Sequence, residues 1–253
     1  MNKNAYSEMS FNQNNHWWYR GRRVILQYLV SQFASGSTRS VLEIGCGTGG
    51  NIEFLSSFGE LTAIDFEELA IETCRRNHVI DSDKIQFIHM NAEDMDLHFS
   101  DKTFDLICMF DVLEHLDDDG ETLRKLKKLM STTSKIIATV PAYQWLWSSH
   151  DEYLHHKRRY TRSQLDALAI ECGYSVVGSG YFNTFLFPIA VINRIFSRFK
   201  GKKTDAMVQV PNSLLNFLLF HIFKFEKRFI SSIRFRFGLS VWVVLENPHS
   251  GHN

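Results

Sequence analysis

The residues best suited to chemistry lie in a glycine-rich turn near position 45. The run Val41–Gly50 reads VLEIGCGTGG, a β-branched stretch that leads into glycines and then into a helix-length segment. Glycine lacks Cβ, so its backbone adopts positive φ and approaches a ligand closely, while the first amides of the following helix stay unpaired. The next predicted strand ends at Asp65, where a carboxylate can accept hydrogen bonds from both hydroxyls of a ribose. The pattern predicts a nucleoside site.

Two kinds of nucleoside fit this turn. Gly45, Gly47 and Gly50 match the G-x-G-x-x-G fingerprint of dinucleotide-binding proteins, which keeps an NAD(P)-dependent oxidoreductase as an alternative. Glu43 argues against it, because a carboxylate inside the preceding strand would repel a pyrophosphate. A further alternative is a cofactor-binding module without catalytic activity.

Four features in order resemble the class I S-adenosylmethionine-dependent methyltransferases, particularly the group that includes the ubiquinone-biosynthesis O-methyltransferases. They are LEIGCGTG at 42–49, the acid Asp65, HMNAED at 89–94 and FDLICMFDVLEHL at 104–116. The resemblance covers nearly the whole chain. It implies an enzyme that uses S-adenosylmethionine as cofactor and releases S-adenosylhomocysteine.

The resemblance also implies which residues contact the cofactor. Glu43 lies near the methionine ammonium, and Asn91 replaces the acid that usually accepts a bond from the adenine amine, with Glu93 as the alternative. The expected cofactor-binding residues are Glu43, Gly45, Cys46, Gly47, Gly49, Asp65, Phe66, Asn91, Ala92, Glu93, Asp111 and Val112, and Leu113 also lines the methionine end. Several have structural alternatives: Asp65 and Asp111 can cap helices, and Glu43 can be an ordinary strand-end carboxylate.

Transfer of a methyl group to a hydroxyl needs alignment, desolvation and a base that removes the hydroxyl proton. Histidine suits this role near neutral pH. The candidates are His115 beside the methionine end and His150, His155 and His156 after the fifth strand, with His150 favoured because that loop begins at the carboxyl end of the sheet. His115 can instead be a core histidine. No metal is expected.

The connection at 141–160, PAYQWLWSSHDEYLHHKRRY, is too polar for a core strand and too long for an ordinary loop. Its aromatic side chains can wall an acceptor pocket or simply pack the loop down. Its basic end can meet an anionic acceptor or form a solvated face. The expected acceptor contacts are Tyr143, Trp147, His155 and Tyr160.

Short β-branched runs alternate with amphipathic segments from about 20 to 181, which predicts βαβ units and a parallel sheet. Strands are expected at 40–44, 61–64, 85–90, 104–110, 135–140, 175–178 and 240–246, and helices at 20–33, 50–57, 67–77, 121–130 and 162–172. Thr161 and Gln164 have the spacing of a capping box. With the family resemblance, which implies the sheet order, we expect an α/β fold with a Rossmann-like, doubly wound seven-stranded sheet, the last strand antiparallel, and an inserted helical cap.

The methyltransferase domain is expected at 1–180 and 239–253, with residues 1–38 as an N-terminal helical cover. Within this cover, HWWYR at 16–20 resembles the family's segment that closes over the cofactor, although it can also anchor the first helix. Residues 181–238 form the insert.

The insert combines positive charge with aromatic side chains. It contains ten Lys and Arg residues against Asp205 and Glu226, and 12 of the 21 phenylalanines. Cationic, phenylalanine-rich helices are typical of interfacial anchors on anionic membranes. The insert therefore predicts peripheral membrane binding and a small-molecule or lipid-like, isoprenoid-type acceptor, with a homodimer interface and a lid as alternatives.

Composition limits the remaining classes. Lys+Arg and Asp+Glu both number 28, so no global charge would recruit nucleic acid. The four cysteines form no C-x-x-C pair, which predicts neither disulfides nor zinc. The N-terminus lacks the apolar stretch of a signal peptide and no window reaches the length of a spanning helix, so we expect a cytoplasmic protein, peripheral on the inner face of the membrane.

Overall fold

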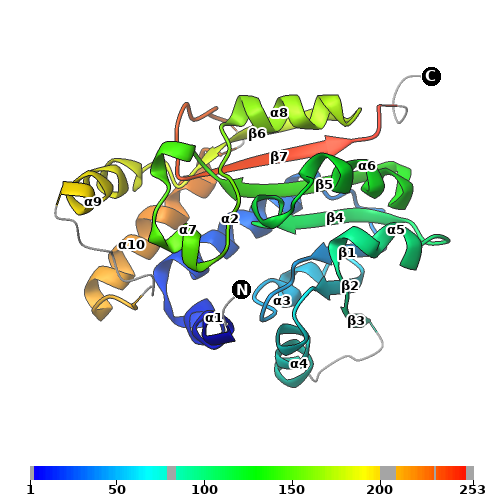
Figure 1. Ribbon diagram of the computed structural model, residues 1–253, viewed down its shortest axis with the longest axis horizontal. Helices are drawn as coiled ribbons and strands as arrows, with labels where there is room; N and C mark the ends of the chain where they lie inside the picture. The colour runs from blue at the N-terminus through cyan, green and yellow to red at the C-terminus, as the bar shows by residue number, and fades with distance from the viewer. Residues whose placement is uncertain (1–2, 79–83, 200–208, 231, 249–253) are drawn as a thin grey trace.

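Seven strands form one mixed sheet in the computed structural model, which describes residues 3–78, 84–199, 209–230 and 232–248 (Figure 1). The strands are β1 (Ser40–Ile44), β2 (Glu60–Asp65), β3 (Ile85–His89), β4 (Phe104–Phe110), β5 (Met130–Pro141), β6 (Ser175–Phe182) and β7 (Ser240–Glu246), in the order β3-β2-β1-β4-β5-β7-β6. β1 to β5 run parallel, and β7 runs antiparallel to β5 and β6. The predicted fold class and the antiparallel last strand are confirmed.

The strand order reverses beside β1. β2 and β3 lie on one side of β1, and β4 and β5 lie on the other. In an open α/β sheet, the ligand crevice opens at the carboxyl ends of the strands beside such a reversal. β1, β2 and β4 end at Ile44, Asp65 and Phe110, so the residues that follow them are expected to border the ligand site.

Helices cover both faces of the sheet and form two hydrophobic cores. One core contains buried residues of α2 (Trp17–Phe33), α3 (Ile52–Leu55), α4 (Glu68–Asn77) and α10 (Ser213–Phe225), and the other contains residues of α5 (Met95–His98), α6 (Asp119–Leu126) and α8 (Arg162–Glu171). The central strands bury side chains on both faces, which explains their near-continuous apolar sequences. The predicted capping box of Thr161 and Gln164 is present at the start of α8.

Some elements differ from their predicted bounds. β6 continues to Phe182 because glycines make room for a neighbouring ring: a Cβ at Gly180 would lie 2.9 Å from Nε1 of Trp242. β5 begins at Met130, and the Ser134 hydroxyl donates to the Phe104 carbonyl oxygen at 2.6 Å within this early part. The sequence does not predict the bounds of α1 (Lys3–Asn15), because its residues are mostly polar and show no apolar residues at helical spacing.

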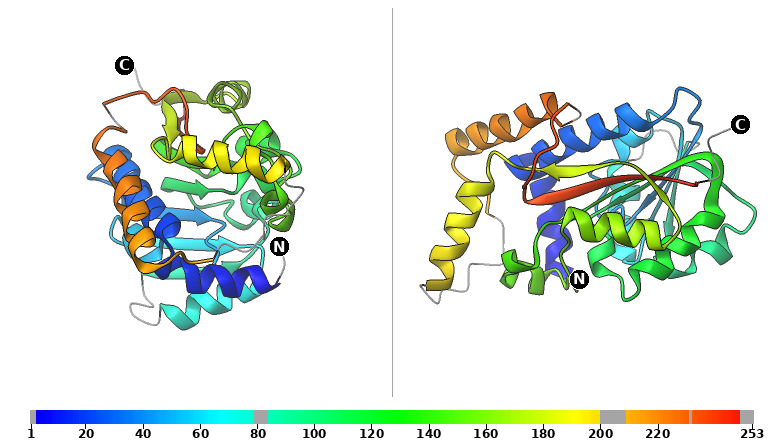
Figure 2. Two further views of the ribbon diagram at one scale, coloured as in Figure 1. Left: turned by 90° about the vertical axis from the view of Figure 1, so that its left-hand side faces the viewer. Right: turned by 90° about the horizontal axis from the view of Figure 1, so that it is seen from above.

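The insert contributes α9 (Phe187–Phe199) and α10. Figures 1 and 2 show both helices, together with α1 and α7 (Ser149–Tyr153), at the end of the molecule toward which β4 and β5 point. Asn216 of α10 ties the insert to the N-terminal helices: its Oδ1 accepts from the Trp17 amide and its Nδ2 donates to the Asn15 carbonyl, each at 2.8 Å. Among the described helices, none is long and apolar enough to cross a bilayer.

Candidate functional site

The glycine turn after β1 has the backbone that only glycine adopts easily. Gly45, Gly47 and Gly49 have φ of 71°, 55° and 85°. Space is also limited, since a Cβ at Gly45 would lie 2.6 Å from Cγ2 of Val112. Side chains at these positions would therefore strain the turn and fill the space beside β1 and β4. The turn is a cradle formed by backbone atoms.

Asp65 holds this cradle in place from the end of β2. Its Oδ2 accepts from the Gly47 amide at 2.8 Å, and its Oδ1 accepts from the Glu67 amide at 2.9 Å. Burial raises the pKa of the Asp65 carboxyl, although both amide bonds oppose that shift. The carboxylate thus supports the start of α4 as well as the turn, and each oxygen has a second lone pair for a ligand.

Glu43 is fully buried at the end of β1 and only half satisfied. Its Oε1 accepts from Nδ2 of Asn51 at 2.8 Å, whereas its Oε2 is buried without a hydrogen-bond partner. Burial raises the pKa of this carboxyl to about 8. An orphaned buried oxygen is costly, and a cationic ligand group would satisfy it. The residues present therefore fit a ligand that carries both a nucleoside and an ammonium.

Helix α1 lies across the glycine turn. Oε1 of Gln13 accepts from the Thr48 hydroxyl at 2.9 Å, and Sδ of Met9 lies 3.0 Å from the position of a Cβ on Gly47. The sequence interpretation missed both side chains, because neither belongs to a motif and only the fold brings them to the turn. The segment at 16–20 begins α2, where His16 caps the helix by accepting from the Trp18 amide.

Asp111 follows β4 with a positive φ of 59°. Its carboxylate pairs with Arg22 of α2 at 2.7 Å and accepts from the Thr139 hydroxyl at 3.1 Å. Asp111 therefore does not cap a helix as its structural alternative predicts, because its partners are a cation and a hydroxyl. Arg22 was missed as a site residue because nothing in its local sequence marks it.

The expected adenine segment forms a short 3₁₀ helix, η1 (Ala92–Asp94). Oδ1 of Asn91 accepts from the Glu93 amide at 3.1 Å and so caps this helix. Ala92 is buried, Glu93 is partly exposed and Phe66 is 65% exposed, while Cys46 is buried in the glycine turn. The structure thus places the expected cofactor residues around the carboxyl ends of β1 to β4.

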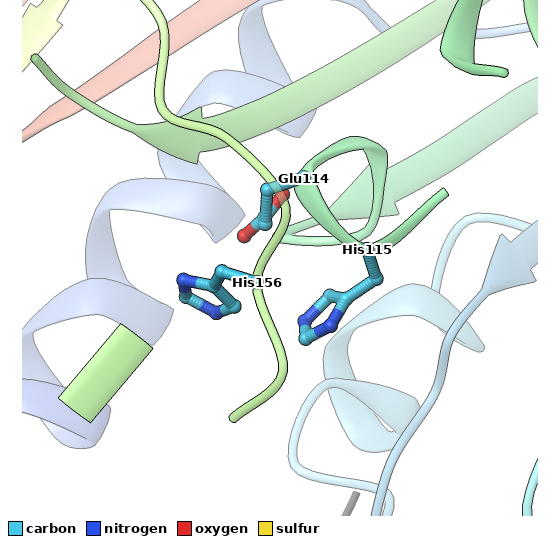
Figure 3. Close-up of side chains that lie close together, drawn as sticks. All are labelled: Glu114, His115 and His156. Carbon is cyan, nitrogen blue, oxygen red and sulfur yellow. The ribbon is translucent and has the colours of Figure 1, made fainter. Parts of the chain in front are cut away.

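The candidate histidines separate into different places. His115 lies in η2 (Leu113–His115), and its ring meets that of His156 edge to face with centroids 4.7 Å apart. Among the described residues, Glu114, His115 and His156 form a close set whose donor atoms lie within 4.8 Å of one another (Figure 3). His150 lies on α7 outside this set, and His155 is exposed with φ of 57°.

The aromatic residues of the 141–160 connection also have different surroundings. Tyr143 stacks on Tyr181 with centroids 5.3 Å apart and contacts Phe187 at the start of α9. Trp147 is partly exposed. Tyr160 is buried, and its hydroxyl donates to Oδ2 of Asp119 at 2.6 Å, so this hydroxyl packs the connection against the core.

Comparison with known proteins agrees with this geometry. Residues 42–138 match the family model described as a methyltransferase domain. A probable S-adenosylmethionine-dependent methyltransferase of Mycobacterium tuberculosis is 23% identical over 162 residues, which are 63% of this chain and 56% of that protein. Residues 42–138 thus form a methyltransferase domain of the class I, S-adenosylmethionine-dependent type. The chain spans just over half the length of the mycobacterial relative.

Two other similarities support this family. The ubiquinone biosynthesis O-methyltransferase of Hydrogenovibrio crunogenus is 26% identical over 189 residues, covering 66% of this chain and 75% of that protein. The N-methyltransferase NodS from Bradyrhizobium japonicum, solved with S-adenosylhomocysteine, shares the fold with a TM-score of 0.56 and 16% identity over 94% of this chain and 90% of NodS. S-adenosylmethionine is the cofactor of the family, and the cradle, Asp65 and the half-satisfied Glu43 fit it.

Proposed function

We propose that this chain transfers a methyl group from S-adenosylmethionine to a hydroxyl oxygen of a small, lipid-like acceptor. The observation that carries the cofactor half of the proposal is the unpaired Oε2 of Glu43 beside the glycine cradle. When bound, the cofactor supplies an electrophilic methyl group on a positively charged sulfur. Glu43 would hold the ammonium, and Asp65 would hold the ribose hydroxyls. The residues 111–113 would border the methionine end.

Two observations support oxygen as the methylated atom. Several relatives carry the name O-methyltransferase, including the one from Hydrogenovibrio crunogenus. In addition, imidazole and carboxyl groups that can handle a hydroxyl proton gather just after Asp111 and Val112. An acceptor that is already a strong nucleophile would not need them.

The exposed face of the insert supports a lipid-like acceptor at an anionic membrane. Both α9 and α10 leave large apolar side chains exposed, and exposed cations lie on α10 and just after it. The apolar residues are Ile189, Ile192, Ile195, Phe196, Leu214, Leu215, Phe217, Leu218, Ile222 and Phe225, and the cations are Lys224, Lys227, Arg228, Arg234 and Arg236. A face of this composition suits a bilayer with anionic headgroups. Because β4 and β5 point toward this end of the molecule (Figure 1), an acceptor could reach the carboxyl ends of the strands from the membrane.

The cofactor and the acceptor can be tested separately. Calorimetry should detect binding of S-adenosylhomocysteine and none of NADH, and binding of NADH alone would favour the oxidoreductase alternative. The protein should then be incubated with methyl-labelled S-adenosylmethionine and with lipid and small-molecule extracts. Label in an O-methylated lipid supports the proposal. Cofactor binding with no labelled product would favour a non-catalytic module.

Membrane binding can be tested by vesicle flotation. The protein should float with phosphatidylglycerol-containing vesicles at low salt and less with pure phosphatidylcholine. The double variant Phe196→Glu/Phe217→Glu should lose flotation, because both side chains are more than half exposed. Leu97→Glu is the matched control: Leu97 is 78% exposed but lies on α5, outside the insert. Wild-type protein that stays unbound at low salt would contradict membrane binding, and a dimer dissociated by the double variant would assign this face to a homodimer.

A further inference from the structure

A polar cluster of one fully buried and two partly buried side chains lies directly after the expected methionine end of the cofactor site. Glu114 and His115 belong to η2, which follows β4, and His156 follows α7 in the connection after β5. The backbone joins the two segments, since the Lys157 amide donates to the Glu114 carbonyl at 2.7 Å. The three side chains thus come from two segments far apart in the sequence and lie close together (Figure 3). This cluster has no role in the cofactor contacts described above.

Glu114 is the unusual member of the cluster. It is fully buried, and neither of its carboxyl oxygens has a hydrogen-bond partner. Burial, reinforced by the charge of Asp111, raises the pKa of the Glu114 carboxyl well above its ordinary value. A neutral carboxylic acid offers one donor and one free acceptor oxygen. Leaving both unused in the interior is costly, so a polar ligand group is expected there.

His156 is oriented from behind by a second buried carboxylate. Its Nδ1 lies 2.9 Å from Oδ1 of Asp151. Arg159 donates to the same carboxylate, from Nε to Oδ1 at 2.7 Å and from Nη2 to Oδ2 at 3.0 Å. Burial alone would raise the pKa of Asp151, but the hydrogen bonds from His156 and Arg159 outweigh it and hold this pKa well below its ordinary value. An ionised Asp151 requires a proton on Nδ1 of His156, which leaves Nε2 as the basic nitrogen.

His115 is suited to contact rather than to proton transfer. Burial, with a smaller effect of His156, lowers the pKa of His115 to about 3, so its ring stays neutral near physiological pH. A neutral imidazole still provides one hydrogen-bond donor and one acceptor. The cluster therefore combines a neutral acid, a neutral imidazole and an imidazole held by a carboxylate.

The spacing in the cluster matches the size of one hydroxyl group. One carboxyl oxygen of Glu114 and one ring nitrogen each of His115 and His156 lie within 4.8 Å of one another. An oxygen that makes two hydrogen bonds of about 2.8 Å at a roughly tetrahedral angle joins atoms ~4.6 Å apart. A single alcohol or phenol oxygen could thus bond to all three groups.

We propose that Glu114, His115 and His156 form the subsite for the acceptor hydroxyl, with His156 as the catalytic base and Asp151 as its positioning residue. This inference rests on the proposed function and names the residues that carry its proton transfer. The acceptor hydroxyl gives its proton to Nε2 of His156 while its oxygen bonds to the methyl carbon, and the carbon–sulfur bond breaks with its electron pair left on sulfur. The imidazolium formed is stabilised by Asp151 and returns its proton to water after the ether leaves.

The first test reads the proton position without any turnover. Long-range ¹H–¹⁵N spectra of the histidine rings, recorded on the full chain with S-adenosylhomocysteine, should show His156 protonated on Nδ1. Addition of p-cresol should shift the His115 and His156 ring signals, whereas its methyl ether, 4-methylanisole, should shift them much less. A proton on Nε2 of His156, or equal shifts with both probes, would overturn the proposal.

The second test measures the contribution of the base. With labelled S-adenosylmethionine and p-cresol as acceptor, His156→Ala should lower methyl transfer by about 10²- to 10⁴-fold, and added imidazole should restore part of it. His98→Ala is the matched control, because His98 is exposed on α5, outside the cluster. S-adenosylhomocysteine should bind His156→Ala as it binds the wild type, so failure of the proposed function would be visible separately as absent cofactor binding.

Two results would contradict the assignment in this second test. A wild-type rate of methyl transfer in His156→Ala would show that His156 is not the catalytic base. Loss of wild-type methyl transfer on treatment with EDTA, restored by Zn²⁺ or Mg²⁺, would assign the cluster to a metal ion instead. His156→Gln should behave like His156→Ala without imidazole rescue, because its amide fills part of the ring position but accepts no proton.

Discussion

Two buried carboxylates at the strand ends have different roles, and the difference lies in their hydrogen bonds. Both oxygens of Asp65 accept backbone amides, so Asp65 maintains the shape of the turn even without ligand. Glu43 keeps one oxygen unpaired in the interior. Glu43 therefore gains most when a cationic ligand binds, whereas Asp65 contributes to both folding and binding.

We expect Asp65→Ala to weaken S-adenosylhomocysteine binding by about 10- to 100-fold, the range for losing hydrogen bonds to a charged group. The change also frees the Gly47 amide, so the unfolding free energy should fall. Calorimetry measures the affinity and urea denaturation the stability. Glu60→Ala is the control, because Glu60 is exposed at the opposite end of β2. An unchanged affinity for S-adenosylhomocysteine in Asp65→Ala would show that Asp65 does not contact the ligand.

Glu43 should make cofactor binding depend on pH. Burial raises the pKa of its carboxyl to about 8, so below this pH the free protein holds Glu43 mostly protonated. An ammonium ligand favours the ionised form, and binding must then release a proton. Affinity should therefore rise with pH between about 6 and about 8, by at most about tenfold per unit, and level off above.

Calorimetry in buffers of different ionisation enthalpy checks this proton release. Glu43→Gln should bind S-adenosylhomocysteine more weakly and with no proton release, because its amide does not titrate in this range. The folded chain keeps this proton up to about pH 8, whereas the unfolded chain loses it near the ordinary pKa of 4.5. The free energy of unfolding should therefore fall as the pH rises between these two values. An affinity independent of pH in the wild type would show that Glu43 does not meet the ammonium.

Among the helices, the contact of α2 with α10 depends on one small residue. Phe223 of α10 is fully buried and lies against Gly21 of α2, where a Cβ would come within 2.6 Å of Cδ1 of the ring. Phe223 also stacks on Phe182 at the end of β6, with centroids 6.3 Å apart. The insert is therefore part of the hydrophobic core on one side, although its other side is exposed.

Gly21→Val should destabilise the protein by about 1–3 kcal/mol, since overpacking forces Phe223 out of its position. The midpoint of urea unfolding measures this change. Gly36→Ala is the control, because no atom lies within 4 Å of a Cβ at that glycine. Combining Gly21→Val with Phe223→Ala should cost less than the sum of the single changes, since both act on one contact. Strict additivity would place the strain elsewhere.

In the whole molecule, the glycine turn, the cluster of Glu114, His115 and His156, and the exposed side chains of α9 and α10 all lie toward the carboxyl ends of the parallel strands. The opposite ends of the strands carry turns such as that held by Asp105, which accepts from the amides of Arg39 and Ser40. We therefore expect ligands to bind at the carboxyl ends of the strands, and the turns at the opposite ends to contribute mainly to stability.

Cofactor binding should stabilise the entire fold, because α1, β1, β2 and β4 all border the site. At about 100 times its dissociation constant, S-adenosylhomocysteine should add ~2.7 kcal/mol to the unfolding free energy, a rise in melting temperature of roughly 5–10 °C for a chain of this size. Thermal unfolding monitored by circular dichroism measures it, with NADH as the negative control. A shift with NADH alone would point to a dinucleotide site.

Local sequence patterns by themselves determined the strands and the glycine turn. The alternation of short apolar runs with amphipathic segments predicted the seven-stranded sheet, and the strands 40–44, 104–110 and 240–246 match their observed bounds. The glycine turn was predictable because positive φ and close backbone approach restrict those positions to glycine. Such features depend on residues that are near each other in the chain.

Only the tertiary structure brought distant residues together. Arg22 reaches Asp111, Gln13 reaches Thr48, and His156 reaches Glu114 across 42 positions, yet none of these pairs shares a motif. The sequence favoured His150 as the base because its loop begins at the carboxyl end of the sheet. The orientation of a histidine ring depends instead on its hydrogen-bond partners, and Asp151, which Arg159 also contacts, lies against His156. Backbone conformation is set by neighbours in sequence, but the burial and pairing of a charge are set by the fold.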